Sequence, residues 1–304
     1  MSVFHHEAIF YGDDEEYLAA TVPEIGATLA AGGTVLAAVA DAKQQLVRGA
    51  LGGDADRVRF TDMERLGRNP ACIIPAWHDF LRAAGPEPVL GIGEPVWPGR
   101  SDAELVECSR HESLLNLAFH GGRDWRLLCP YDAAALDADV LDEAFRNHPH
   151  VRTHGRSHAS ADYGGHAAIL GWEDRLPAPA RRPAELTFTE SELPLLRSFV
   201  GERARSAGFD PDRVPDLVLA VNELATNSLR HAGGHGVLRT WEENGSFLCE
   251  VRDDGRIGDP LAGRDRPKDL RGGGRGLWIV NQLCDLVQVR SSRAGNVVRL
   301  HMAI

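Results

Sequence analysis

The sequence predicts two domains of different classes: an N-terminal α/β domain with a mostly parallel sheet, and a C-terminal α+β two-layer sandwich. With 304 residues, the chain is long enough for two domains of ordinary size. Short apolar runs alternate with helical patterns in the first half, whereas helices followed by mostly strands make up the second half. Between them, after Asn147, the composition shifts to Pro, Gly, Ala and His.

In the first half, strands and helices take turns, which favours a mostly parallel sheet covered on both faces, of a degenerate RecA-like kind. The expected strands are Ala8–Tyr11, Thr34–Ala40, Val58–Thr61, Pro88–Ile92 and Arg126–Cys129. The expected helices are Asp14–Ala31, Ala42–Leu51, Ala71–Ala83, Asp102–Ala118 and Asp139–Arg146. Ser101 or Asp102, ahead of Glu104, is typical of a helix N-cap.

A linker is expected at residues 151–183, between domains at 1–150 and 184–304. The prolines from Pro177 to Pro183 favour a stiff, extended chain. Five histidines in and before this stretch invite a metal-site interpretation: His148, His150, His154, His158 and His166. Their spacing is irregular, with no carboxylate or Cys at ligand offsets, so we interpret them as part of a solvated linker.

The second half is expected to begin with a short strand and two helices. Two pairs of strands follow, with a third helix between the pairs. The helices are Ser191–Gly208 and Pro211–His231, the second with Asp210 as N-cap. The strands are Glu185–Thr189, Val237–Trp241, Phe247–Asp253, Leu286–Ser291 and Val297–Met302, with a further helix at Leu277–Cys284. Asn244-Gly245 between two of these strands is a strong hairpin signal.

Composition narrows the functional class. The net charge is -11, which disfavours broad attraction to nucleic acid. The sequence shows neither a basic region followed by an apolar run at its start nor an apolar stretch long enough to cross a bilayer. The five cysteines are scattered without a CxxC pair, as in proteins of a reducing compartment. We therefore expect a cytoplasmic protein that contacts neither membrane nor nucleic acid.

The second expected helix of the C-terminal half carries the first of three informative clusters. Glu223, Asn227 and His231 recur every four residues and share one face. An Asn amide oxygen is a suitable ligand for Mg2+, and a Glu one turn away can polarise a hydroxyl near a phosphate. A polar helix face in water explains this cluster equally simply.

The other two clusters are Asp253-Asp254-Gly255, at the end of an apolar strand, and Gly272–Leu277, which opens a helix. The carboxylate of Asp253 could accept a hydrogen bond from an adenine amino group, and successive glycines can turn their N–H groups toward phosphates. The segment up to Arg271 could act as a basic lid. The simpler alternatives are an ordinary Asp-Gly turn, a flexible loop and solvated arginines. No GxxxxGK[ST] motif is present.

Together, the three clusters resemble the GHKL, or Bergerat, ATP-binding fold over residues 184–304, and within it the RsbW-like anti-sigma-factor serine/threonine kinases. This resemblance implies ATP and Mg2+ as cofactors, Glu223 as catalytic base and Asn227 as the Mg2+ ligand. It implies a nucleotide site made of Asp253, Gly255, Arg271, Gly272, Gly274, Gly276 and Leu277. One position departs from the family pattern: Ile257 stands where a second glycine is expected. The short lid and the lack of a phospho-acceptor histidine helix argue against a full sensor histidine kinase.

The N-terminal half resembles the MEDS sensory domain over about residues 4–150. Its polar candidates are His5, His6, Glu94, Trp97, Glu107, Cys108, His111 and Glu112. Two hypotheses use them: a metal site of His111 with Glu107, Cys108 or His5/His6, and a ligand pocket of Glu94, Trp97 and Glu112. Polar helix residues that pair with neighbouring strands are the interpretation we favour.

These resemblances imply an anti-sigma regulatory factor, as in transcription regulation of the stress response. It would phosphorylate a Ser or Thr of a STAS-type anti-sigma-factor antagonist and choose between that protein and a sigma factor, gated by a small molecule at the N-terminal domain. The alternative is a non-catalytic ATP-binding switch that sequesters one of these partners. Direct action on DNA is disfavoured by the acidic charge. The oligomeric state, monomer or homodimer, stays open.

Overall fold

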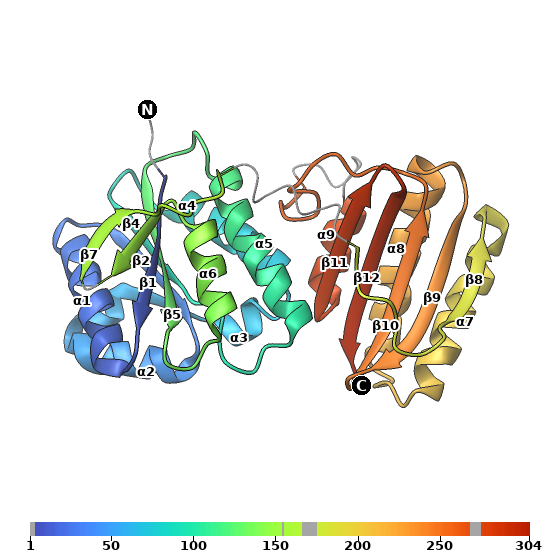
Figure 1. Cartoon of the computed structure of the whole chain (residues 1–304), viewed down its shortest axis with the longest axis horizontal. Helices are drawn as coiled ribbons and strands as arrows, with labels where there is room; N and C mark the ends of the chain where they lie inside the picture. Colours follow the sequence, from blue (N-terminus) through green and yellow to red (C-terminus); the bar gives the residue numbers. More distant parts are fainter. Residues whose placement is uncertain (1–3, 154, 166–174, 268–274) are drawn as a thin grey trace. The chain divides into compact units, whose positions relative to one another are not determined.

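The computed structural model describes residues 4–153, 155–165, 175–267 and 275–304 (Figure 1). The chain divides into two compact units, Met1–Ile169 and Leu170–Ile304. Each unit has its own sheet, sheet A in the first and sheet B in the second. Two domains of different classes, one mostly parallel and one antiparallel with helices, confirm the predicted fold class.

Within the described residues, sheet A has seven strands in the order β3-β2-β4-β5-β1-β6-β7. All its pairs are parallel except β6 with β7. The five expected strands are confirmed within a few residues at their ends. The strands are β1 (Phe4–Tyr11), β2 (Thr34–Val39), β3 (Val58–Asp62), β4 (Val89–Gly93), β5 (Trp125–Asp132), β6 (His150–Thr153) and β7 (Arg156–Ala159).

The expected helices of the first unit are also confirmed. They are α1 (Asp14–Ala30), α2 (Asp41–Leu51), α4 (Ile73–Ala83), α5 (Asp102–Ala118) and α6 (Ala138–Asn147), joined by the short α3 (Met63–Leu66). Ser101 caps α5 in a capping box, since its side chain accepts from the backbone of Glu104 and the Glu104 side chain accepts in return. Across the described part of the chain, no helix is long and apolar enough to cross a membrane.

Strands β6 and β7 lie among residues that the sequence analysis assigns to a linker. β6 joins sheet A beside β1, and β7 pairs with β6. Each is only four residues long, too short for an alternating pattern to be recognised, and the pairing partner in sheet A comes from tertiary structure. The solvated-linker interpretation is wrong for His148, whose exposed fraction is 0%.

The second unit is a two-layer sandwich. Sheet B is antiparallel with the order β11-β12-β10-β9-β8. Its inner face packs on three helices around a core that includes Leu217, Val221 and Leu300. The elements are β8 (Ala184–Phe188), α7 (Leu193–Ser206), α8 (Val214–His231), β9 (Gly236–Glu243), β10 (Ser246–Asp253), α9 (Arg275–Leu283), β11 (Leu286–Ser292) and β12 (Gly295–Ala303).

Two local predictions in this unit have different outcomes. The β9–β10 hairpin turns at Asn244 and Gly245, both with positive φ (50° and 73°), as a type I′ turn requires. The expected helix start at Pro211 is wrong, because α8 begins at Val214. The side chain of Asp210 accepts from the N–H of Asp212 at 2.9 Å and so caps a turn that precedes the helix.

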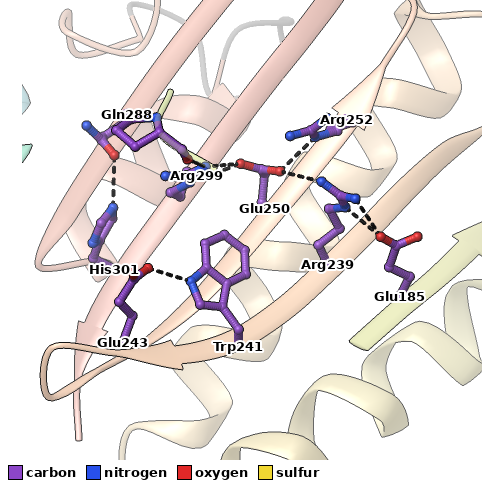
Figure 2. A network of polar contacts seen from close by, with 10 residues as sticks. Glu185, Arg239, Trp241, Glu243, Glu250, Arg252, Gln288, Arg299 and His301 are labelled. Atoms are coloured by element: carbon purple, nitrogen blue, oxygen red, sulfur yellow. Dashed lines mark hydrogen bonds and ion pairs between the residues drawn. The ribbon is translucent and has the colours of Figure 1, made fainter. Parts of the chain in front are cut away.

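The outer face of sheet B carries a polar network around Glu250 (Figure 2). Glu250 is fully buried, and its carboxylate accepts from Arg299 at 2.6 Å and from Arg252 at 2.7 Å. Arg239 reaches it at 3.8 Å and also bonds to Glu185 at the sheet edge. Because three guanidinium groups surround one carboxylate, this buried charge is compensated entirely by protein cations.

Candidate functional site

Helices α8 and α9 meet at Gly276, which joins the first and third sequence clusters. A Cβ atom at Gly276 would lie 2.9 Å from Asn227 Nδ2 and 3.0 Å from Glu223 Oε2. No larger residue fits there without displacing these two side chains. Glu223 and Asn227 are half-buried on α8, so both keep a side open to a ligand. Gly276 therefore lies directly against the side-chain ends of Glu223 and Asn227, and a larger residue would have to push them aside.

The second cluster is attached to the same helix through Asp253 at the end of β10. Its Oδ2 atom accepts from Ser228 Oγ at 2.6 Å, and Ser228 follows Asn227 on α8. Its Oδ1 atom accepts from Gly255 N at 2.9 Å and Asn296 Nδ2 at 2.8 Å. A carboxylate has about four acceptor positions, so three internal donors leave roughly one for a ligand. Asp253 is thus held in one orientation.

The segment after Asp253 explains the departure at Ile257. Its N–H donates to Ser291 Oγ at 2.9 Å and to Asn296 Oδ1 at 3.2 Å. Among the described residues, Asn244 is the only non-glycine with positive φ, so Ile257 has an ordinary backbone conformation. Glycine is needed instead at Gly255, where a Cβ would lie 2.7 Å from Ala232 Cβ.

Several site residues were not found from the sequence. Ser228, Ser291 and Asn296 hold Asp253 and Ile257 in place. Asn296 pairs with Asp253 in the β10–β12 register, a signal that appears only once the strands are aligned. Of the expected residues, Leu277 lies in the core of the unit, while Arg271, Gly272 and Gly274 fall outside the described residues.

In the first unit, Glu94 lies at the carboxyl ends of the parallel strands, directly after β4. Burial raises the pKa of Glu94 to about 7, although Tyr11 Oη donates to its carboxylate. Trp97, its expected pocket partner, stacks instead on the Arg100 guanidinium, 3.5 Å from the ring centroid. The structure places Glu112, the third residue of that hypothesis, in a different contact group.

The polar residues of α5 point inward. Glu107, Cys108, His111 and Glu112 are each at most 2% exposed. Cys108 Sγ donates to Pro95 O at 3.3 Å, and Glu107 lies 3.9 Å from Arg110. His5, on β1, contacts Glu7 at 3.5 Å and stacks on His150.

One group with metal-ligand character was found in the described part of the chain: His6, Glu112, Cys129 and His148. It contains His6 and Glu112 from the expected candidates, but neither His111, Glu107, Cys108 nor His5. Burial lowers the pKa of His6 to about 4. Cys129 and His148 were not predicted as ligands, because nothing in their local sequence marks them.

Comparison with known proteins assigns both units. Residues 5–149 match the MEDS family, the methanogen/methylotroph, DcmR sensory domain. Residues 186–302 match the histidine kinase-like ATPase domain family, which implies ATP binding. No curated protein matches the chain.

Two solved structures are similar to part of the chain. One contains the RsbU and RsbW domains of Rv1364c from Mycobacterium tuberculosis, with 19% identity and a TM-score of 0.31, over 42% of this chain and 33% of that one. The match therefore spans only about a third of the mycobacterial chain. The other is the Acinetobacter baumannii histidine kinase AdeS, with 12% identity and a TM-score of 0.25, over 40% of this chain and 68% of that one. At these scores neither structure supports a functional inference.

Proposed function

We propose that this chain, which joins an N-terminal MEDS domain to a C-terminal histidine kinase-like ATPase domain, is an ATP-dependent regulatory protein kinase. Its C-terminal domain would bind Mg-ATP and phosphorylate a Ser or Thr of a STAS-type anti-sigma-factor antagonist. The sigma factor would be the competing partner, and the N-terminal domain would gate the exchange.

The observation that carries this proposal is the position of Gly276, where an added Cβ would meet the side chains of both Glu223 and Asn227. It puts a base, an amide ligand and a glycine backbone at one place, as phosphoryl transfer from Mg-ATP requires. Asn227 would hold Mg2+, which would supply positive charge to neutralise the phosphates. Glu223 would take the proton of the acceptor hydroxyl as its oxygen bonds to the γ-phosphorus, while the bond from that phosphorus to the β–γ bridging oxygen breaks and ADP leaves.

Asp253 would bind the adenine amino group with its remaining acceptor position, and Arg271 would contact the γ-phosphate from the lid. The three donors on Asp253 support this role, because a pre-oriented acceptor loses little entropy on binding. The specificity for adenine over other bases would come from this one carboxylate.

Two variants test the proposal in the full chain. Asp253→Asn removes a charged acceptor, worth about 1.5–3 kcal/mol, so ATP affinity should fall about 10–100-fold in calorimetry. Asp254→Asn is the matched control, since the Asp254 side chain is 77% exposed and lies 3.3 Å from His235. The ATP affinity of this variant should be unchanged. Equal losses in both variants would contradict the adenine role.

The variant Glu223→Ala distinguishes a protein kinase from a non-catalytic ATP-binding switch. It should bind ATP like the unmodified chain but fail to transfer labelled γ-phosphate to a panel of STAS-type proteins from the same genome. If the unmodified chain binds ATP and labels none of them, the non-catalytic switch is the better description. Labelling by Glu223→Ala at the normal rate would remove Glu223 from the mechanism.

A further inference from the structure

Four potential ligand atoms from four parts of the first unit converge at one buried point. His6 lies on β1, Cys129 on the neighbouring β5, Glu112 on α5, and His148 directly follows α6. Figure 1 shows α5 and α6 side by side in this unit. The four residues are between 0% and 1% exposed. A group that spans so much of the chain and is so fully withdrawn from water must have its charges and lone pairs satisfied internally.

The hydrogen bonds of His6 determine which of its nitrogens carries the proton. Asn116 Nδ2 faces two carbonyl oxygens, of Glu112 at 3.3 Å and Asn147 at 2.8 Å, so this atom is the amide donor. The oxygen of the same amide therefore faces His6 Nδ1 at 3.0 Å and accepts its proton. In a neutral ring, Nε2 of His6 is left with a lone pair directed into the cluster.

His148 has the same arrangement. Its Nδ1 lies 2.8 Å from the carbonyl oxygen of Ala144, which can only accept, so Nδ1 carries a proton. In a neutral ring, Nε2 then has the lone pair. Fixing a ligating imidazole through its other nitrogen in this way is the usual arrangement around a bound metal.

Both lone pairs face the carboxylate of Glu112, which likewise has no proton to donate. Glu112 Oε2 lies 3.0 Å from His6 Nε2 and 3.3 Å from His148 Nε2. His148 Nε2 and the second oxygen of Glu112 are both buried, and neither has a hydrogen-bond partner among the residues that the structure describes. The Cys129 thiol can supply one proton to this group and no more. A cation between the four atoms would convert these opposed lone pairs into ligands.

Four of the six separations among these atoms, 3.0–3.6 Å, are close to those around a tetrahedral ion of zinc size. Zinc bonds of about 2.0–2.1 Å to nitrogen or oxygen and about 2.3 Å to sulfur imply donor separations of about 3.3 Å, or about 3.6 Å where one donor is sulfur. Cys129 Sγ lies 3.3 Å from His6 Nε2 and 3.6 Å from Glu112 Oε2. All four atoms lie within 4.8 Å of one another.

We propose that His6, Glu112, Cys129 and His148 form a binding site for one divalent transition-metal ion of the zinc class. Two neutral imidazoles, a carboxylate and a thiolate balance the charge of such an ion, and the thiol of Cys129 releases its proton as the metal–sulfur bond forms. All four coordination positions come from the protein, so the ion has no open position for substrate. It would tie β1 and β5 to α5 and to the end of α6.

Metal titration of the chelator-treated full chain tests this site. Zn2+ should bind at one ion per chain, and Co2+ should give the visible spectrum of a tetrahedral site with a thiolate-to-cobalt band. Cys129→Ser should abolish that band and weaken binding by more than about 100-fold, because loss of even an outer partner costs 10–100-fold. Asn116→Ala, which removes the partner of His6, should fall in that smaller range.

Cys108→Ser is the matched control, since Cys108 is equally buried and its thiol bonds to Pro95 O outside the cluster. It should bind the metal as the unmodified chain does. X-ray absorption of the unmodified zinc-bound chain needs no variant and should show one sulfur and three nitrogen or oxygen neighbours. No sulfur, two or more sulfurs, or equal metal affinity in Cys108→Ser and Cys129→Ser would overturn the proposal.

Discussion

Glu112 in the first unit and Glu250 in the second are both fully buried carboxylates, yet their surroundings differ in kind. Glu250 is met by arginine side chains, which stay protonated and bring their positive charge with them (Figure 2). Glu112 is met by two imidazole nitrogens, which offer lone pairs, and by a thiol, which can donate a single proton. A buried carboxylate can therefore belong to a finished structural network, as at Glu250, or to a site for an ion, as we propose for Glu112.

The largest expected effect is on the finished network. Glu250→Gln leaves the Arg299 guanidinium, whose side chain is only 5% exposed, without its counter-charge. Breaking a buried pair on one side costs about 3–5 kcal/mol, and we expect a loss near 3 kcal/mol because the amide still accepts one bond. Hydrogen exchange of peptides from β10 and β12 measures this loss for the second unit alone.

Arg252→Ala is the control for that experiment. The Arg252 side chain is 44% exposed, and Arg299 still compensates Glu250 when it is removed. The cost should therefore stay within about 1 kcal/mol, as for surface pairs. Equal costs for Glu250→Gln and Arg252→Ala would mean that burial of the carboxylate does not set the energetics of this network.

Glu94 represents a third way to accommodate a buried carboxylate, by protonation. Burial is the main cause that raises its pKa from 4.5 to about 7; the Tyr11 hydroxyl and Lys43 oppose this shift, and Asp132 adds to it. Tyr17 also lies within electrostatic reach. Between about pH 4.5 and 7 the unfolded carboxyl is ionised while the folded one keeps its proton, so stability falls as pH rises through this range.

Glu94→Gln should remove that pH dependence. The unmodified chain should lose up to about 3 kcal/mol relative to the variant across the window, at about 1.4 kcal/mol for each pH unit. Urea denaturation of the full chain at several pH values measures the difference, with hydrogen exchange of β1 and β4 peptides as the readout for the first unit. Parallel stability curves for the two proteins would show that Glu94 is ionised in the folded state.

The same comparison shows what could be read from the sequence. Helices such as α5 and strands such as β10 were predicted because periodicity and caps are local. The clusters around Glu223, Asp253 and Gly276 were recognisable because their spacing is short. The fold and the family that these clusters predicted are confirmed, whereas the roles of the individual residues remain predictions.

The cluster at Glu112 could not be predicted in the same way. His6 and Glu112 are 106 positions apart, and they meet only because β1 and β5 are adjacent and α5 packs against them. His148 was assigned to a solvated linker because Pro- and His-rich sequence has no period, whereas the turn after α6 buries it. Ligands brought together by topology leave no local signal.

The smallest expected effect distinguishes Glu112 from Glu250 most directly. In the chelator-treated chain, Glu112→Gln should change the stability of the first unit by no more than about 1 kcal/mol, because an amide NH2 can donate to an imidazole Nε2 that the carboxylate cannot serve. With Zn2+ at 100 times its dissociation constant, only the unmodified chain should gain about 2.7 kcal/mol. Exchange of β1 and β5 peptides with and without Zn2+ gives both quantities. If Glu112→Gln without metal costs as much as Glu250→Gln, then the imidazoles already compensate Glu112 as the arginines compensate Glu250, and the two carboxylates are equivalent.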